Sequence, residues 1–328
     1  MFQVGAAIVS GVPNVENDKT HAVKFICDAL AGATSHGNLY GDIFHVKNKQ
    51  KKESTNNIAY TSEPLVPHQD LSYYESKPGL QLLHCVEFGD DIMGGESILI
   101  DALAAAAEFR RIAPHHFRTL ASCSASFVKQ RKDVCMTYLQ PHIVLQNNVQ
   151  SSASSNQYNS MKDDDILNAE IVAVNWSPPF EGPLCIPPDL IIPYYDAYAA
   201  FEQMIDFTIP PAHLSVENDE DLNEINKNNL YSDYARRFTW KYKLKPGEML
   251  VFNNQRLLHG RKGFRMTRKS NGVTNSNTSN VSLSRHLIGA YTNIDDTFNK
   301  YRILHYQRLG SNSIGKICNV GNGTSIIP

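Results

Sequence analysis

Short apolar runs with the composition of β-strands restrict the fold of this sequence more than any other feature. They recur along the chain as QLLHCVEF (81–88), SILI (97–100), EIVAVNW (170–176), MLVFNN (249–254) and VSLSRHLIGAY (281–291). Runs of this kind, separated by turn-rich segments and a few helical patterns, are typical of antiparallel sheets. We therefore predict a mixed, mainly β protein whose antiparallel core has helices packed outside it.

Four helices are predicted between and after these runs. The first, Asp18–Leu30, has apolar residues at helical spacing. The second begins after Asp101, a residue type that caps helix N-termini well, and stops before Pro114. Two more are expected within Tyr194–Ile205 and within Asp295–Leu309.

Three polar segments predict loop inserts in a single domain. Residues 146–165, 217–229 and 267–280 are rich in Asn, Ser or charged residues and poor in apolar ones. The sequence has no internal repeat and no linker flanked by two separate apolar cores. We expect one domain over residues 1–310, followed by a C-terminal tail over 311–328.

The composition argues against several classes of partner. With 328 residues and a formal net charge of −2, the chain has no charge excess that would favour nucleic acid or a membrane surface. No apolar run approaches the roughly 18 residues of a membrane span. The N-terminal MFQVGAAIVSGVPN does not resemble a signal peptide, and its GAAIV run (5–9) predicts a buried strand. The six cysteines form no CxxC pair, which suits buried, reduced thiols. We expect a cytoplasmic protein.

The segment His68-Gln69-Asp70 has the spacing of a metal site. Residues i and i+2 of a strand point to the same face, so the His68 and Asp70 side chains can converge on one ion. An H-x-D tripeptide alone is better explained as a surface histidine near an acidic turn. However, His259 follows a β-like run far down the chain and supplies a third ligand. Two histidines and one carboxylate are the ligand set of non-haem Fe(II) sites that use O₂.

Other histidines compete for this role. His84 lies in an apolar run and is expected in the core, while His115 and His116 follow Pro114 in a predicted helix. None of them has a carboxylate at strand spacing. His68, Asp70 and His259 are therefore the best candidate metal ligands and catalytic residues.

An arginine near the last histidine is expected to bind a 2-oxo acid by its far carboxylate. A planar guanidinium binds a carboxylate with two hydrogen bonds. Arg285 alternates with apolar residues in VSLSRHLIGAY, on the same predicted face as Tyr291. An arginine on an inward apolar face is costly unless it meets an anion. Arg285 is the first choice among the arginines around His259, and Arg265 is the second.

Together these segments resemble the γ-butyrobetaine dioxygenases and the related trimethyllysine dioxygenases. The matching pieces run from about Val4 to about Leu309 in the family's order. They are NNIAYTSEPLVPHQDLSYYESKPGLQLLHC, GGESILIDAL, KLKPGEMLVFNNQRLLHGR, SRHLIGAY and DDTFNKYRIL. The resemblance implies a double-stranded β-helix, or jelly roll, with flanking α-helices.

The resemblance also implies the roles of individual residues. His68, Asp70 and His259 would bind Fe(II), and Arg285 would anchor 2-oxoglutarate. Two further positions, Leu83 and Ser97, would line the co-substrate site. The substrate's trimethylammonium group would lie in an aromatic cage, with a polar residue near its carboxylate; the matching positions are Tyr40, Phe44, Tyr60, Tyr291 and, for the polar residue, Asn57.

The sequence departs from the family pattern in several places. Family members carry an N-terminal domain before the catalytic one, and we expect it to be absent here because Met1 begins almost directly at the catalytic region. Gln69, Asn253 and Gln255 replace the usual residues beside the iron ligands. Phe44 stands where a Trp is usual, which weakens the cation–π contact.

The expected activity is Fe(II)- and 2-oxoglutarate-dependent hydroxylation of γ-butyrobetaine to L-carnitine in carnitine biosynthesis, with O₂ as oxidant and ascorbate as reductant. The expected partner is a small quaternary ammonium molecule, and a homodimer is left open. Two alternatives remain: the substrate is trimethyllysine or another betaine or amino acid, or the chain is an inactive β-helix binding protein.

Overall fold

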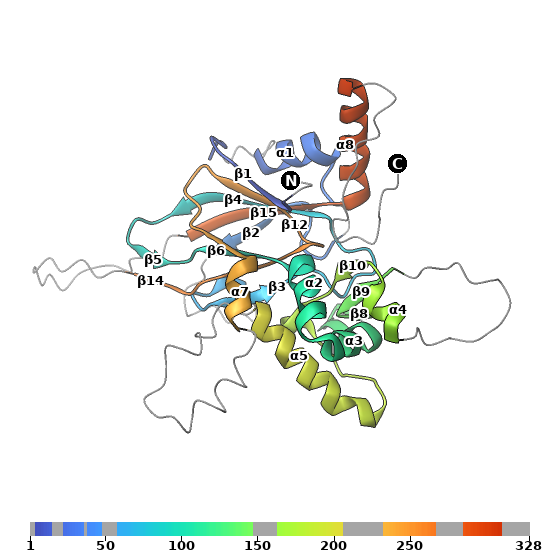
Figure 1. Ribbon diagram of the computed structural model, residues 1–328. Helices are drawn as coiled ribbons and strands as arrows, with labels where there is room; N and C mark the ends of the chain where they lie inside the picture. Colours follow the sequence, from blue (N-terminus) through green and yellow to red (C-terminus); the bar gives the residue numbers. More distant parts are fainter. Residues whose placement is uncertain are drawn as a thin grey trace, which may run out of the picture.

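The computed structural model describes residues 4–14, 22–35, 38–47, 58–146, 163–205, 232–266 and 285–309. The predicted inserts at 217–229 and 267–280 lie outside the described residues, as do most of the insert at 146–165, the tail at 311–328 and Asn57. Within the described residues, two antiparallel sheets and a set of helices form the body of the molecule (Figure 1).

The larger sheet has five antiparallel strands in the order β1-β12-β4-β15-β2. Its strands are β1 (Ala6–Val9), β12 (Met249–Asn253), β4 (Leu80–Phe88), β15 (Arg285–Thr292) and β2 (Phe44–Lys47). Strand β1 lies where the GAAIV run predicted it, but the prediction that it is buried is wrong. As an edge strand it pairs only with β12, and its Ala7 side chain is exposed.

The smaller sheet has four antiparallel strands in the order β11-β6-β13-β3. Its strands are β11 (Thr239–Tyr242), β6 (Ser97–Asp101), β13 (Leu257–Arg261) and β3 (Leu65–His68). Three two-stranded ribbons complete the β structure: β5 (Ile92–Gly94) with β14 (Phe264–Met266), β7 (Ser124–Arg131) with β8 (Val134–Pro141), and β9 (Ile143–Leu145) with β10 (Ile171–Val174).

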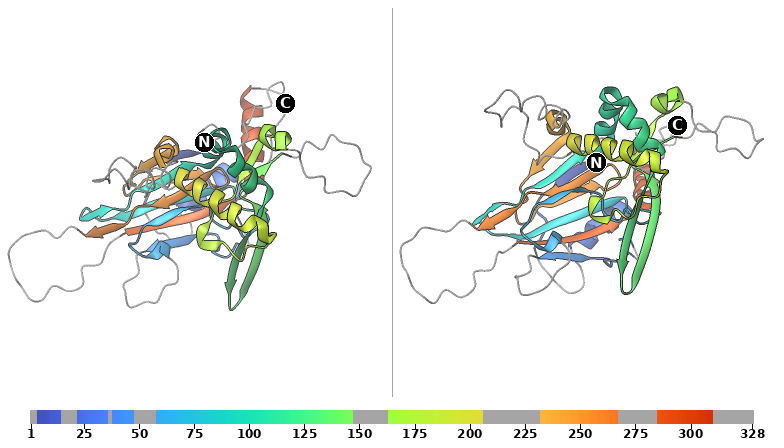
Figure 2. Two further views of the ribbon diagram at one scale, coloured as in Figure 1. Left: turned by 60° about the horizontal axis from the view of Figure 1, so that its bottom comes forward. Right: turned by 90° about the horizontal axis from the view of Figure 1, so that it is seen from below.

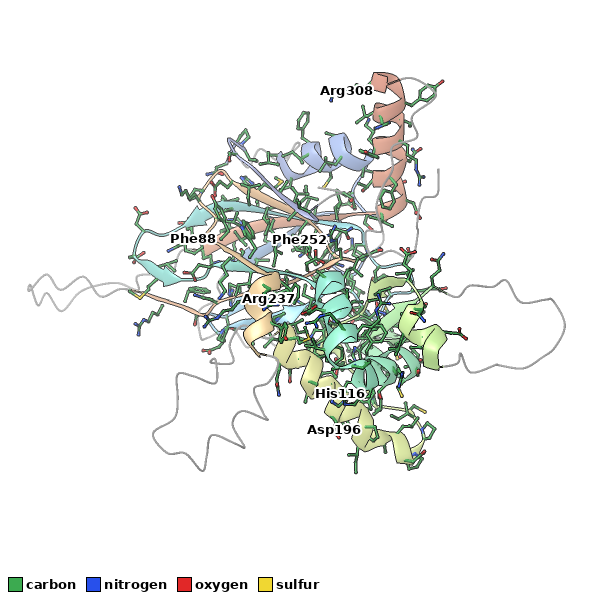
Figure 3. The ribbon with its side chains drawn as sticks, in the orientation of Figure 1. Phe88, His116, Asp196, Arg237, Phe252 and Arg308 are labelled. Carbon is green, nitrogen blue, oxygen red and sulfur yellow. The ribbon has the colours of Figure 1, made fainter. Side chains whose placement is uncertain are left out.

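The two sheets pack face to face. Along each strand the side chains alternate between the core that the sheets share and an apolar layer on the outer face. In β12, Leu250 and Phe252 point into the core between the sheets, whereas Met249 and Val251 point outward. In β6, Leu99 points into the same central core. This arrangement is the jelly-roll core with flanking helices that the sequence predicted, and Figure 3 shows Phe88 and Phe252 among the strands.

Helices cover the outer faces of both sheets (Figure 1). The described α-helices are α1 (Ala22–Ala31), α2 (Ala102–Ile112), α3 (Pro114–Ser122), α4 (Asp163–Asn168), α5 (Ile191–Ile205), α7 (Ser232–Phe238) and α8 (Ile294–Leu309). Helix α1 packs on the larger sheet through Val23 and Cys27. Helices α2, α3 and α5 bury Phe109, Phe117 and Phe201 against the smaller sheet.

The helix predictions agree closely with this arrangement. Asp101 caps α2 by accepting a hydrogen bond from the backbone N–H of Ala104 at 3.2 Å, and α2 ends before Pro114. The predicted start of the first helix at Asp18 lies outside the described residues. No described helix is long and apolar enough to cross a membrane.

The described cysteines are free, as predicted, but not all of them are buried. Cys27, Cys85 and Cys123 lie in the core, while Cys135 and Cys185 are exposed.

Candidate active site

The two candidate histidine ligands lie side by side on neighbouring strands of the smaller sheet. His68 ends β3 and pairs in register with His259 of β13, so their ring centroids lie 4.3 Å apart. The register shifts just beyond this pair, where a side chain on Gly260 would lie 2.7 Å from the carbonyl oxygen of Leu65. Glycine at this position allows the two backbones to approach closely enough to align the two rings.

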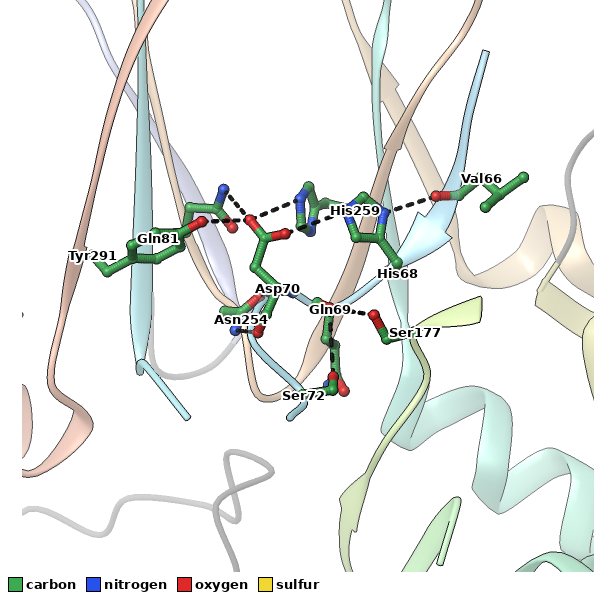
Figure 4. A network of polar contacts seen from close by, with 10 residues as sticks. All are labelled: Val66, His68, Gln69, Asp70, Ser72, Gln81, Ser177, Asn254, His259 and Tyr291. Carbon is green, nitrogen blue, oxygen red and sulfur yellow. Dashed lines mark hydrogen bonds and ion pairs between the residues drawn. The ribbon is translucent and has the colours of Figure 1, made fainter. Parts of the chain in front are cut away.

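Asp70 follows β3 and turns its carboxylate toward both histidines (Figure 4). Its Oδ1 lies 3.4 Å from Nε2 of His68, and its Oδ2 lies 3.6 Å from Nε2 of His259. The next residue, Leu71, has a φ of 62°, a left-handed conformation that is strained for a branched side chain. Asn254 holds the Asp70 backbone on both sides, accepting from its N–H at 2.9 Å and donating to its carbonyl at 3.0 Å.

Surrounding side chains fix the orientation of these three groups. Tyr291 donates its hydroxyl to Oδ2 of Asp70 at 2.6 Å, and Gln81 donates to the same oxygen at 2.9 Å. Nδ1 of His68 lies 2.9 Å from the carbonyl oxygen of Val66, which can only accept, so this nitrogen carries the proton. Nε2 of His68 therefore faces Asp70, where a metal ion would take the place of a proton.

The electrostatics of the site favour an ionised carboxylate. Burial lowers the pKa of His68, but its interaction with Asp70 outweighs burial and raises that pKa above the ordinary value. Burial opposes the ionisation of Asp70, but its electrostatic interaction with the imidazoles of His259 and His68 and the hydrogen bond from Tyr291 hold its pKa below the ordinary value. Burial, with repulsion from His68, lowers the pKa of His259 to about 3. At neutral pH Asp70 and His259 are in the protonation state that metal binding requires.

These three residues fit a divalent iron ion. Their ligand atoms all lie within 4.8 Å of one another, and they are the one such group found among the described residues. Nδ1 of His259 is buried without a hydrogen-bond partner in the described part of the chain. Two imidazoles and one carboxylate gathered on one side of a pocket leave positions open for other ligands, as in 2-His-1-carboxylate iron sites.

Two candidate co-substrate residues, Arg285 and Leu83, line the same pocket from the facing sheet, and the third, Ser97, lines it from β6 of the smaller sheet. Arg285 of β15 is buried, and burial lowers its pKa to about 10. It has no hydrogen-bond or ion-pair partner among the described residues, and its Nε is buried and unpaired. A buried guanidinium without a partner is costly, so this end of the pocket is suited to an anion.

The four described cage candidates line the pocket as well: Tyr40, Phe44, Tyr60 and Tyr291. The Phe44 and Tyr291 rings stack with centroids 5.0 Å apart, and Tyr40 lies 5.9 Å from Phe44 and 6.5 Å from Tyr291. Gly289 makes room for this cluster, since a side chain there would lie 2.3 Å from the Phe44 ring.

The second-choice arginine, Arg265, does not belong to the pocket. It is exposed on β14, with Nη2 3.8 Å from the sulfur of Met93. The pocket lining also includes the polar residue Gln81, which the sequence did not single out, and Arg261, which it weighed only as one of several arginines around His259. Gln81 lies two residues before Leu83 on β4, so strand alternation places both on one face, a signal available from sequence. Arg261 lies two residues after His259 by the same rule.

Comparison with known proteins places this geometry in a family. The family described as "Taurine catabolism dioxygenase TauD, TfdA family" matches residues 1–274, most of the chain. The chain belongs to this family. The TauD, TfdA assignment agrees with the jelly-roll core and with the resemblance to dioxygenases seen in the sequence.

Several curated relatives and a solved structure are similar to this chain. Gamma-butyrobetaine dioxygenase of Homo sapiens is 25% identical over 267 residues, which are 81% of this chain and 53% of that protein. The mitochondrial trimethyllysine dioxygenase of Gallus gallus is 24% identical over 275 residues, which are 82% of this chain and 49% of that protein. The chain thus spans about half the length of these relatives.

A structure of asparagine oxygenase in complex with Fe(II), 2S,3S-3-hydroxyasparagine and succinate has a TM-score of 0.50 and 11% identity, covering 88% of this chain and 74% of that chain. At this level of identity, the similarity supports the fold.

Proposed function

We propose that this TauD-family chain forms an Fe(II)- and 2-oxoglutarate-dependent dioxygenase that hydroxylates a trimethylammonium substrate, with γ-butyrobetaine as the first candidate. One observation carries the proposal. A single pocket between the two sheets brings together the His68, Asp70 and His259 side chains, an unpartnered buried arginine and a cluster of aromatic rings. These groups suit, in turn, the iron, the far carboxylate of 2-oxoglutarate and the cationic group of the substrate.

His68, Asp70 and His259 would hold the iron. The bound metal supplies the redox chemistry by which O₂ and 2-oxoglutarate yield succinate, CO₂ and a hydroxylated substrate. Tyr291 and Gln81 keep the Asp70 carboxylate turned toward the histidines. Because these donors come from the larger sheet and the ligands from the smaller one, the packing of the two sheets orients the site.

Arg285 would bind the far carboxylate of 2-oxoglutarate through its planar fork. Leu83 and Leu287 line the pocket on the same sheet and exclude water from this contact. A charged hydrogen bond is stronger when water is excluded, because the surrounding dielectric constant is lower. Ser97, on β6, supplies a hydroxyl to the same pocket.

The aromatic cluster favours a quaternary ammonium over a primary amine. A quaternary ammonium has no N–H to donate, so aromatic faces are its best binding surface, each worth about 0.5–2 kcal/mol. Asp70 is the one acidic residue among the described residues that line the pocket, and it faces the histidines. The pocket therefore offers a cation aromatic rings rather than a free carboxylate. The substrate's own carboxylate was expected near Asn57, which stays a prediction.

The first experiment measures succinate formation with Fe(II), ascorbate and 2-oxoglutarate, comparing γ-butyrobetaine, trimethyllysine and no added substrate. Stimulation by γ-butyrobetaine alone supports the proposal, and stimulation by trimethyllysine alone favours the activity of the second relative. Turnover of 2-oxoglutarate that neither compound stimulates supports an oxygenase and rejects both compounds as substrates. No turnover in iron-loaded protein rejects the enzyme and favours a binding protein.

Replacing the co-substrate anchor tests the same assignment. Arg285→Met removes a charged hydrogen-bonding partner worth about 1.5–3 kcal/mol, so the KM for 2-oxoglutarate should rise about 10- to 100-fold. Arg265→Met removes an exposed arginine as the matched control and should leave this KM unchanged. Equal effects of the two substitutions would contradict the assignment of Arg285.

A further inference from the structure

Arg261 is a buried arginine to which the proposed function gives no role. It lies on β13, two residues after His259, lines the pocket and is only 5% exposed. Its guanidinium donates three hydrogen bonds, all to backbone carbonyls of one short segment. Nη1 reaches the carbonyl of Ala59 at 3.3 Å, and Nη2 reaches those of Thr61 at 2.8 Å and Glu63 at 2.5 Å.

The segment that Arg261 holds, residues 58–63, forms one wall of the pocket. It begins with a 3₁₀ turn over Ile58–Tyr60, whose three side chains line the pocket. It then leads into β3, which ends at His68. One further hydrogen bond ties it to the sheets, from the backbone N–H of Phe264 to the carbonyl of Ser62 at 3.0 Å. Arg261 thus supplies three hydrogen bonds that tie this segment to β13.

The positively charged guanidinium of Arg261 binds backbone carbonyls rather than a carboxylate. No carboxylate lies within salt-bridge distance of it among the described residues, and Arg285 lines the same pocket with a charge of the same sign. The centres of both guanidiniums lie near the Phe264 ring, at 4.8 Å for Arg261 and 5.7 Å for Arg285. A buried cation beside a like charge is unfavourable unless its hydrogen bonds are well satisfied. Here carbonyls of the wall accept the three hydrogen bonds from Nη1 and Nη2.

We propose that Arg261 is a positioning residue that determines substrate specificity by fixing the 58–63 wall, so that Tyr60 faces the occupant of the aromatic cluster. The proposal rests on the proposed function in one respect, that the occupant is a quaternary ammonium. A lysine at this position keeps the charge but replaces the planar fork with a single ammonium. It is therefore expected to hold the three carbonyls less firmly.

A competing role for Arg261 is direct binding of the co-substrate. Its Nε is buried without a partner in the described part of the chain, and Arg285 lies in the same pocket. If Arg261 bound 2-oxoglutarate, its loss would raise the KM for 2-oxoglutarate as the loss of Arg285 does. If it positions the wall, its loss acts on the cationic substrate instead.

The first arm of the test is hydrogen exchange and needs no substrate. The wild-type chain is compared with Arg261→Lys and Arg265→Lys. Arg265→Lys is the control, at an exposed arginine on β14, the next strand along the chain. Faster exchange in peptides that cover residues 58–65 is expected in Arg261→Lys alone, with β4 peptides unchanged. Unchanged exchange in the 58–65 peptides overturns the proposal, whatever the activity of the enzyme.

The second arm is kinetic and uses γ-butyrobetaine and 2-oxoglutarate. Arg261→Lys is expected to raise the KM for γ-butyrobetaine about 10- to 100-fold, the size of effect that small misplacements produce. Its KM for 2-oxoglutarate should stay within about twofold, as for independent sites. Tyr60→Ala should raise the KM for γ-butyrobetaine by a smaller factor in the Arg261→Lys background than in the wild type, if both residues act through one wall. Strict additivity, or a rise confined to the KM for 2-oxoglutarate, overturns the proposal.

The two arms separate this proposal from the proposed function. If the wild-type enzyme does not respond to γ-butyrobetaine, the function fails while the exchange result still decides whether Arg261 holds the wall. If the wild-type enzyme responds and Arg261→Lys changes neither exchange nor KM, the function stands and the role of Arg261 is rejected.

Discussion

Tyr291 takes part in two contacts that usually belong to different residues. Its ring stacks on Phe44, and its hydroxyl donates to the carboxylate of Asp70. The sequence placed Tyr291 on the same face as Arg285 and assigned it to the cage by resemblance. Its bond to Asp70 was not predicted, because that bond joins residues 221 positions apart. One side chain thus connects the proposed substrate site to the proposed metal site.

Substitution of Tyr291 separates these two contacts. Tyr291→Phe keeps the ring but removes the hydroxyl, so we expect metal affinity to fall about 10- to 100-fold, as for other groups that orient a ligand. The KM for the cationic substrate should change little. Tyr291→Ala should weaken both metal binding and binding of the cationic substrate. Anaerobic Fe(II) titration measures metal affinity, and steady-state kinetics measure the KM for the cationic substrate. If Tyr291→Phe raised this KM as much as Tyr291→Ala does, the assignment would be contradicted.

Gln69 and Gln255, two departures from the family pattern, contact each other behind the site. The Gln69 side chain donates to the backbone carbonyl of Gln255 at 3.1 Å, and Gln255 donates to the carbonyl of Lys77 at 2.8 Å. Both side chains are buried, and neither lines the pocket. Their identity can therefore differ from the family pattern while the three candidate ligands stay together.

At the scale of elements, β15 was the best-predicted strand. Its alternation correctly placed Arg285 and Tyr291 on the inward face, while Ile288 and Ala290 pack outward beneath α1. The β7–β8 ribbon, by contrast, was missed, and Figure 2 shows it as the long green hairpin beside the sheets. Its polar strands hide an inward face in which Ala125 and Phe127 are buried. A period-of-two reading of residues 124–131 would have found it.

The contact between β2 and β15 depends on Gly289. Gly289→Ala would push a methyl group into the Phe44 ring, and we expect a loss of about 1–3 kcal/mol in unfolding free energy, typical of overpacking. The KM for the cationic substrate should rise because the ring is displaced. Urea denaturation and kinetics measure the two effects. In a Phe44→Ala background the same change should cost much less, and an equal cost in both backgrounds would contradict this account.

His142 joins the β9–β10 ribbon to α5 and makes stability depend on pH. Its ring nitrogens lie 2.7 Å from the carbonyl of Asn175 and 2.8 Å from the hydroxyl of Tyr194. Burial lowers its pKa from 6.5 to about 4. Between these values the unfolded chain binds a proton that the folded chain does not, so the contribution of His142 to the unfolding free energy falls as pH decreases, by about 2 kcal/mol from pH 7.5 to pH 5.

Urea denaturation at the two pH values tests this expectation. His142→Asn should remove the His142 contribution, so its unfolding free energy at pH 5, relative to pH 7.5, should be higher than in the wild type. Glu181 acts in the opposite direction, because burial raises its pKa to about 7 and its extra folded-state stability is lost as pH rises. Glu181→Gln should therefore give a lower unfolding free energy at pH 5, relative to pH 7.5, than in the wild type. Identical pH dependence in wild type and both variants would contradict both assignments.

At the scale of the whole molecule, the candidate site spans the two sheets. His68 and His259 belong to the smaller sheet, whereas Gln81, Arg285 and Tyr291 belong to the larger one. The apolar core between the sheets, with Phe252 only 5.0 Å from the His259 ring, sets the distance between them. The site therefore exists only when the two sheets are packed together.

Metal binding should consequently stabilise the folded chain. A ligand that binds only the folded state adds about 2.7 kcal/mol when its concentration is 100 times its Kd. We expect anaerobic Fe(II) to raise the unfolding temperature and a chelator to reverse the change. His259→Ala should lose the response, whereas His115→Ala, at an exposed histidine of α3, should keep it. An undiminished response in His259→Ala would contradict the metal assignment.

The sequence by itself determined the local features of this protein. Strand alternation placed Arg285 with Tyr291, and residue types marked the start and end of α2, because these patterns depend on neighbours a few positions away. His68 and Asp70 converge as predicted, but not by strand alternation, because β3 ends at His68 and Asp70 lies in the turn that follows. Only the tertiary structure decided which distant residues meet. The pairing of His68 with His259, the bond from Tyr291 to Asp70 and the hold of Arg261 on residues 58–63 all depend on strand register and sheet packing. Periodicity reveals the face on which a side chain lies, whereas its partner is set by how the whole chain packs.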